Sequence, residues 1–465
     1  LPQLQGALGA TQDQIAWTVT FNIVGTAIVT PMTGWLTLRF GRRRLMLCAV
    51  LGFAIASLLC GRATNLQELV FYRICQGAFG APLVPLSQAI ILDVFPSRKH
   101  SFATAIWGMG VVFGPVIGPT VGGYVSEAYD WRWVFYIIGP FSVLAFFGSW
   151  LYIRDNRFDP KSRLDWTGFI SLSIALAALQ LLLDRGNRLD WFDSTEILIE
   201  AAVALICFHI FVSHILTSPN PYLNPRLMQD RNYALGVILV FLYGMLNFTP
   251  MVLFPTMLQS LRGYPDSIIG LLLAVRGIGA LLGNFLVVWI NRFDPRIGLA
   301  LGFAAQAGSC LFLAQFDINM TTSDVAWASF IQGFGVGLAW VPLTIIMFSG
   351  IDPKDVPEGA SVLHLLRNIG SSIYISLTVT LIIRSTTTNY MAMSSAINPF
   401  NELLAFPSTM GQWDIGSLEG LSRLSGEIER QASMIGYLNA FYLLAITGFA
   451  SIPLIFLVRR HDQRS

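Results

Sequence analysis

The chain has 465 residues, of which 54% are hydrophobic and 12% are charged, and its formal net charge is +2. Soluble domains usually carry about 25% charged residues, so this composition excludes an ordinary soluble protein and predicts one that lies mostly in a membrane. The small net charge gives no reason to expect nucleic-acid binding.

Thirteen apolar segments are long enough to cross a bilayer, which needs about 20 residues per helix. They lie near 15–37, 45–62, 66–92, 102–124, 132–153, 166–184, 195–216, 233–260, 267–291, 297–316, 322–349, 361–383 and 436–458. The sequence therefore predicts an all-α integral membrane protein. Because Leu1 opens a polar stretch, we expect one further helix upstream and fourteen in all.

Lys and Arg are distributed unequally between the two sides that these spans define. Eighteen lie on the side of the loop after the first span, and seven on the other side. Basic loops mark the cytoplasmic side of a membrane protein, so we expect that loop and the C-terminus to be cytoplasmic.

The loop after the first span is also the most basic short segment, and it reads GWLTLRFGRRR over residues 34–44. We consider it a candidate regulatory segment on the cytoplasmic side. Its candidate residues are Gly34, Arg39, Gly41, Arg42 and Arg43.

The third span contains an arginine, Arg73, about two turns from its start, with Gln76 one turn further on. Charges inside a membrane are costly and usually functional. We expect Arg73 and Gln76 to take part in proton coupling, together with Asp93 at the cytoplasmic end of the span; the alternative is that Arg73 extends to the surface. Proton coupling needs a carboxylate that changes protonation, and no mid-membrane Asp or Glu is evident. We therefore expect either that the upstream helix carries this carboxylate or that another group takes part in coupling instead.

The fourth span carries six glycines and two prolines in sixteen residues, GMGVVFGPVIGPTVGG. Glycines at every fourth position lie on one helix face and let a neighbouring backbone come close, and each proline removes a backbone hydrogen bond and favours a kink. We therefore expect a bent helix with a close-packed face. This face could contribute to packing alone, or it could act as a hinge that seals the transport pathway. The candidate hinge residues are Gly110, Gly114, Pro115, Gly118, Pro119, Gly122 and Gly123.

Other spans hold isolated polar or aromatic residues that could line a central apolar cavity, as small-molecule sites require. These candidates are Asn22, Gln76, Asn247, Arg276, Gln332 and Trp340. The alternative for each is an ordinary contact between helices. Arg367 raises the same question, but lies nearer the cytoplasmic end and could extend to the surface.

The longest outer loop is expected at 384–435. Its part 417–435 has leucines near helical spacing, which predicts an amphipathic helix. We expect either a cap over the outer end of the protein or a docking surface for a partner.

Several other functions lack their sequence signals. GFGVGL and GIGALLG lie within apolar spans rather than after a strand, so they do not indicate a dinucleotide loop. The chain has no P-loop, no HExxH and no CxxC. We expect no cofactor, no metal and no enzymatic activity, because clustered His, Asp or Glu at one membrane depth are not seen.

Taken together, these motifs resemble the major facilitator superfamily, and within it the fourteen-helix drug:proton antiporters of the EmrB/QacA type, closest to the EmrB branch. The basic loop resembles the family's G-x-L-a-D-r-x-G-r-[kr] motif, although Leu38 stands where Asp is usual. Residues 72–77 resemble the R-x-x-Q-G motif, whose Arg is tied to proton transfer, and residues 110–123 resemble the antiporter signature, with an added proline at Pro119. The stretches 130–133, 183–186 and 190–192 are similar to further segments of the EmrB branch.

The resemblance implies a fold with two six-helix bundles and two extra central helices. The bundles would be 1–153 and 233–465, and the extra helices would lie in 154–232. It implies a bacterial inner-membrane exporter of amphipathic compounds that exchanges them for protons by alternating access. Its partners would be a periplasmic adaptor protein and an outer-membrane channel, with 384–435 as a candidate contact. The alternatives are an exporter of one metabolite, fatty acid or siderophore, and a membrane protein that transports nothing.

Overall fold

The computed structural model describes residues 8, 12–96, 99–154, 164–219, 221–352, 355–398, 401 and 417–459, and within these ranges the chain is helical with no strand. Eleven helices are long and apolar enough to cross a membrane, or up to twelve if one bent pair counts as a span. The helix α7 (His100–Ala128) adds 29 residues, about 43 Å at 1.5 Å per residue, which also suffices. A helix thus lies at each of the thirteen predicted spans.

The first group of helices is interrupted where proline removes a backbone donor. The 55° bend between the first two helices lies at Pro31, and Pro82 stands between the fourth and fifth helices of the group. Gly41, at φ 85°, forms the turn before the next helix, a conformation that favours glycine. The group comprises α2 (Gln12–Val29), α3 (Thr33–Phe40), α4 (Arg42–Arg62), α5 (Leu66–Gly80), α6 (Leu83–Val94), α7, α8 (Trp133–Tyr136) and α9 (Ile138–Tyr152).

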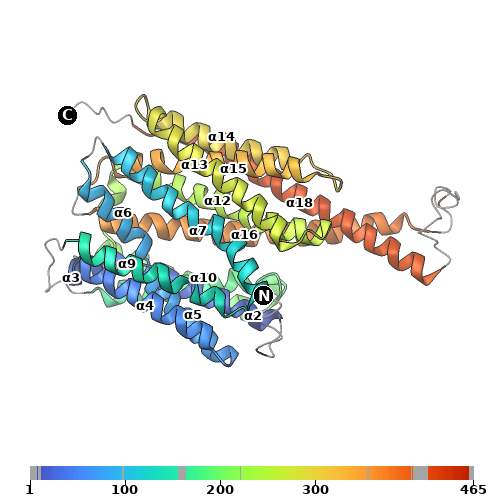
Figure 1. Ribbon diagram of the computed structural model, residues 1–465, viewed down its shortest axis with the longest axis horizontal. Coiled ribbons are helices and arrows are strands. Elements are labelled where there is room, and N and C mark those ends of the chain that lie inside the picture. Colours follow the sequence, from blue (N-terminus) through green and yellow to red (C-terminus); the bar gives the residue numbers. More distant parts are fainter. Residues whose placement is uncertain are drawn as a thin grey trace.

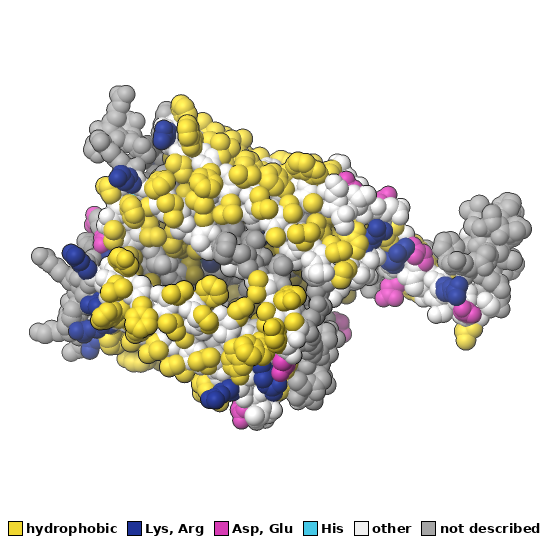
Figure 2. Space-filling model, in the orientation of Figure 1, with side chains coloured by type: hydrophobic (Ala, Val, Ile, Leu, Met, Phe, Trp, Pro, Cys, Tyr) yellow, Lys and Arg dark blue, Asp and Glu magenta, His cyan; other side chains and the backbone are white. Residues whose placement is uncertain are grey.

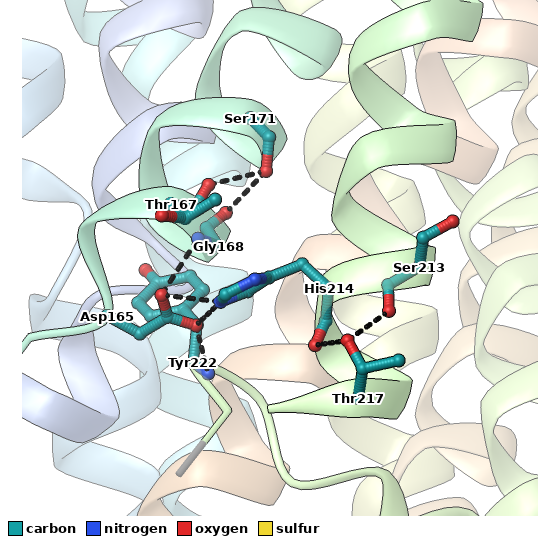
Figure 3. Close-up of polar contacts among 8 residues, drawn as sticks. All are labelled: Asp165, Thr167, Gly168, Ser171, Ser213, His214, Thr217 and Tyr222. Atoms are coloured by element: carbon teal, nitrogen blue, oxygen red, sulfur yellow. Dashed lines mark hydrogen bonds and ion pairs between the residues drawn. The ribbon is translucent and has the colours of Figure 1, made fainter. Parts of the chain in front are cut away.

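Two extra helices, α10 (Trp166–Arg185) and α11 (Thr195–Thr217), form an antiparallel pair that is fastened at both ends. At one end the Asp165 carboxylate caps α10 by accepting from Gly168 N at 3.0 Å, and also lies 2.9 Å from His214 Nε2 (Figure 3). The Tyr222 backbone N–H donates to the same carboxylate at 3.1 Å. At the other end Arg185 forms ion pairs with two glutamates of α11. The predicted extra helices are therefore present, and polar contacts at both ends hold them together.

The last group contains the largest buried core. Leu239, Phe303, Leu343 and Phe441, from four different helices, are fully buried in it. The helices are α12 (Arg231–Arg262), α13 (Asp266–Ile290), α14 (Pro295–Leu313), α15 (Thr322–Phe348), α16 (Val356–Ser395) and α18 (Leu418–Phe456).

The glycine-rich runs of α13 and α15 are packing motifs. A Cβ added to Gly333 would lie 1.8 Å from the Arg276 carbonyl oxygen, and one added to Gly337 would lie 2.2 Å from that of Ala280. Glycine at these positions lets the two backbones touch, as in other membrane helix pairs. The resemblance of these runs to dinucleotide loops is therefore coincidental.

The two groups lie side by side, with α7 between them and packed along α13 (Figure 1). Hydrophobic side chains cover most of the flank seen in Figure 2, while Lys and Arg lie toward the two ends. We call the end that carries the α3–α4 turn, with Arg42 and Arg43, the basic end. This distribution is what a membrane-spanning bundle requires, because lipid contacts the flanks and water the ends.

The expected loop 384–435 is largely helical instead. The helix α16 continues to Ser395, and α18 begins at Leu418 and runs without a break into the last span. A 40-residue helix is about 60 Å long, twice the hydrocarbon thickness of about 30 Å. Both helices project from the end opposite the basic end (Figure 1), and Tyr390 Oη lies 2.9 Å from Ser425 Oγ between them. The helix predicted within 417–435 is confirmed, although Leu418 and Leu421 on it are exposed. The described parts of 384–435 project as a pair of helices, here called the projecting hairpin, rather than lie across the outer end as a cap.

Candidate functional site

A cavity of about 80 Å³ lies where α7 meets α12, α13, α15 and α16. Three of the residues predicted for a substrate cavity line it: Asn247, Arg276 and Trp340. The rest of its polar and aromatic lining is Tyr243, Phe248, Asn284 and Arg367.

Arg276 is held by neutral oxygens from two neighbouring helices. Its Nη2 donates to the Asn247 carbonyl oxygen at 2.8 Å and to Asn247 Oδ1 at 2.7 Å, and its Nε donates to Gln332 Oε1. Gln332 is fully buried behind it and does not line the cavity. The structure therefore brings Asn247 and Gln332 into contact with Arg276, while Trp340 lines the same cavity.

A proline in α12 explains why Gln332 is useful there. Pro250 has no N–H, so the helix cannot supply a donor to the Leu246 carbonyl oxygen four residues earlier. Gln332 Nε2 donates to that oxygen at 3.1 Å. The same side chain thus satisfies a backbone acceptor left by Pro250 and orients Arg276.

Arg367 extends into the protein rather than to the surface. Its guanidinium lies 5.3 Å from the Phe248 ring centroid and 5.5 Å from that of Trp340, within the range of cation–π contacts. The ion pairs among the described residues include neither Arg367 nor Arg276. The cavity therefore carries positive charge that these residues do not neutralise.

The two N-terminal cavity candidates belong to a different cluster. Gln76 accepts from Arg73 Nη1 at 2.9 Å and donates to Ser57 Oγ at 2.8 Å, while Asn22 Nδ2 donates to the Arg73 carbonyl oxygen at 2.9 Å. The Arg73 guanidinium lies 4.6 Å from the Phe135 ring centroid. Asn22 and Gln76 thus surround Arg73 and do not line the central cavity.

Asp93 lies at the basic end, away from Arg73. It accepts from Arg42 Nη1 at 2.6 Å, which gives the basic loop a carboxylate although Leu38 replaces the usual one. In the same loop Arg43 Nη2 donates to the Trp150 carbonyl oxygen at 2.8 Å. The structure therefore places Asp93 with the basic loop and separates it from the other two coupling candidates.

The glycine face of α7 is open in this structure. Gly110, Gly114 and Gly118 are exposed, and a Cβ added to any of them would meet nothing within 4 Å. At Gly122 the nearest contact would be Val134 at 3.8 Å. The expected close packing is therefore wrong for this conformation. The other hinge candidates lie within the helix, but their side chains are outside the described part: Pro115, Pro119 and Gly123.

Contacts near the basic end join the first group to the last. An added Cβ at Gly34 would lie 3.1 Å from Glu358 Cα of α16, which explains the glycine. Deeper in, His364 Nε2 lies 2.7 Å from Gln88 Oε1. Trp107 of α7 stacks on Trp340 with ring centroids 6.0 Å apart.

Sequence reasoning missed His364, Gln88 and Trp107, although one signal was available. An ionisable residue within an apolar span is itself a candidate functional residue, and His364 meets that criterion.

A second, larger cavity of about 300 Å³ lies between α2, α10, α12 and α16. Its lining is mostly aliphatic and includes Ile23, Leu176, Leu179 and Leu365. Phe248 lines this cavity as well as the central one. No sequence pattern indicated it, because its walls come from segments far apart in the chain.

Known proteins of similar sequence are named as export or resistance proteins. The multidrug export protein EmrB of Escherichia coli strain K12 is 34% identical over 436 residues, which cover 93% of this chain and 83% of that one. The fatty acid resistance protein FarB of Neisseria gonorrhoeae is 32% identical over 466 residues, which cover 99% and 91%.

Solved structures of similar fold include an XylE double-tryptophan mutant, with TM-score 0.62, 13% identity and coverage of 96% of this chain and 86% of that one. Another is the human organic anion transporter MFSD10, with TM-score 0.60, 14% identity and coverage of 94% and 83%. Identities this low support the fold alone. Residues 1–375 match the domain family described as Major Facilitator Superfamily. The chain therefore belongs to the major facilitator superfamily, in which its similar relatives include multidrug export proteins.

Proposed function

We propose that the protein exports amphipathic compounds across the bacterial inner membrane in exchange for protons, by alternating access. The observation that carries this proposal is the central cavity, where α7 of the first group meets the last group and where charge and aromatic rings occur together. The relatives named as multidrug export proteins support the same direction of transport.

The basic end would be cytoplasmic under the charge rule for membrane proteins. The structure then corresponds to an outward-facing conformation, because contacts such as His364 with Gln88 join the groups near this end. In the opposite conformation, α7 would close against its neighbours at the outer end. The glycine face that is open here would then pack, which accounts for small residues at Gly110, Gly114 and Gly118.

Proton coupling would involve the Arg73 cluster. A guanidinium inside the membrane favours the ionised form of a nearby carboxylate. Gln76 accepts from the guanidinium and Asn22 donates to the Arg73 backbone, so the cluster would present a positive charge against which a carboxylate would titrate.

The projecting hairpin of α16 and α18 would contact a periplasmic adaptor protein, which would lead to an outer-membrane channel. Its outer part is polar: Arg423 and Arg430 form ion pairs with glutamates on exposed faces of α18. A helical hairpin outside the bilayer offers a rigid surface for such a partner.

Everted vesicles containing the full-length protein test this function. After the vesicles are energised, adding a transported compound should cause proton efflux and a rise in lumenal pH. Arg73→Ala should abolish the response, whereas Arg62→Ala, an exposed arginine of the neighbouring helix α4, should leave it unchanged. No pH response to any amphipathic compound, with the protein correctly inserted and its adaptor present, would refute the proposal.

A further inference from the structure

The two cavities share one aromatic wall. Phe248 of α12 lines both the central cavity and the larger aliphatic one. On α16, Arg367 lines the central cavity and its neighbour Asn368 lines the other, and Arg367 Nη2 donates to Asn368 Oδ1 at 3.3 Å. The cavities are thus adjacent compartments of different chemistry that share Phe248.

The central compartment has buried polar atoms without a hydrogen-bond partner among the described residues: two are donors, and one, Asn284 Oδ1, is an acceptor. Among the described residues, Arg367 Nε and Trp340 Nε1 are buried and have no hydrogen-bond partner. Leaving such donors unpaired costs about 1–3 kcal/mol each, and more for a charged group. Both residues line the cavity, so an occupant of the cavity is the group that can accept from them.

The charge of the central compartment also indicates what kind of group would occupy it. Arg276 and Arg367 both line it, and neither is paired with a carboxylate in the described part of the chain. A buried charge without a counter-charge is strongly unfavourable. An anion would supply the counter-charge, whereas a cation would add repulsion in a medium where charges interact strongly.

The larger compartment suits an apolar chain. Of its lining, the side chains from α10 are Leu176, Leu179, Gln180 and Leu183, and those from α2 include Ile23 and Ala27. At about 300 Å³ it has more than three times the volume of the central cavity, so the bulk of a ligand would lie here.

We infer that the two cavities together bind an amphipathic organic anion with one long apolar chain. The acidic group lies beside Arg276 and Arg367, and the chain passes Phe248 into the compartment formed with the extra helix α10. This inference rests on the proposed export function and names its substrate class. It also gives α10 a role, because this helix supplies one wall of the chain compartment.

Direct binding tests the inference without requiring transport. The full-length protein in lipid nanodiscs is dialysed against radiolabelled dodecanoate or dodecyltrimethylammonium at pH 8, with empty nanodiscs as background. Dodecanoate should bind at least tenfold more tightly than the cation. Arg276→Gln and Arg367→Gln should each remove this preference, whereas Arg276→Lys, which keeps the charge, should retain most of it. Arg262→Gln, at the exposed outer end of α12, is the matched control and should change nothing.

The chain compartment is tested with carboxylates of increasing length. Each buried methylene contributes about 0.8 kcal/mol, so affinity should rise about fourfold per carbon from octanoate to dodecanoate. Leu179→Trp fills the compartment and should flatten this dependence while leaving short carboxylates bound. Ile174→Trp, on the exposed side of the same helix, should leave the dependence intact.

Two outcomes would overturn the inference: equal affinity for the cation and the carboxylate, or a chain-length dependence that Leu179→Trp leaves unchanged. Either result, combined with proton efflux driven by a cationic compound in vesicles, would leave the export function standing. Carboxylate binding in nanodiscs without proton movement in vesicles would instead refute the export function and keep the binding site.

Discussion

Replacing Gln332 with leucine tests how the central arginine is held. The two side chains have similar volume, so Gln332→Leu removes hydrogen bonds with little change in packing. It leaves two buried groups unpaired: Arg276 Nε and the Leu246 carbonyl oxygen. The latter has no substitute donor in its own helix because Pro250 lacks an N–H.

The size of the effect follows from these two groups. Hydrogen bonds between membrane helices contribute only about 0.6 kcal/mol on average. Leaving a buried polar group unpaired, however, costs about 1–3 kcal/mol. We therefore expect Gln332→Leu to lower the free energy of unfolding by about 2–4 kcal/mol.

A double-mutant cycle with Pro250→Ala isolates the backbone contribution. Alanine at this position supplies the N–H that Leu246 lacks, so Gln332→Leu should cost about 1 kcal/mol less in the Pro250→Ala background. The measurement is the free energy of unfolding in mixed micelles, obtained by titrating a denaturing detergent into a mild one.

Gln306→Leu is the matched control. Gln306 is equally buried, but the backbone oxygen to which it donates, that of Gly302, lies within its own continuous helix. Its own Oε1 has no partner, so its loss should cost less than about 0.5 kcal/mol. If Gln332→Leu costs the same with and without Pro250, the link between the proline and the glutamine is refuted.

Three further predictions concern helix packing. Gly333→Ala should destabilise the protein, because the new Cβ would lie 1.8 Å from the α13 backbone. Gly308→Ala, whose Cβ would meet nothing within 4 Å, should instead stabilise it by about 0.5–1 kcal/mol. Thermal unfolding measures both variants, and equal effects would contradict the packing argument. Gly114→Leu should leave folding and ligand binding intact, because the position is open in this structure. It should nevertheless abolish transport, because the leucine would block closure of α7. Normal drug resistance at normal expression would refute this. Asp165→Ala should lower the free energy of unfolding by about 1–2 kcal/mol, because the α10 cap and the contact with His214 are lost. The control is Ser194→Ala at the start of α11, where the side chain makes no cap hydrogen bond and we expect no change.

The sequence alone located the spans and marked several polar and aromatic residues that lie in or beside the central cavity. Runs of about 20 apolar residues have few alternatives to membrane helices, because each backbone polar group must be paired within the segment. A charged or polar side chain in such a run stands out, and Asn247, Arg276, Gln332 and Trp340 were found in this way. Pro250 likewise predicts an unpaired carbonyl at Leu246 from local chemistry alone.

Which of these residues meet was decided only by the tertiary structure. Asn22 and Gln76 had the same local signal as Asn247, yet they surround Arg73, because contacts between helices depend on how distant segments pack. His364 and Gln88 are 276 residues apart, and no pattern in either segment predicts their pairing. The open glycine face of α7 had to be observed as well, since one sequence must fit both conformations of a transporter and does not specify which one is populated.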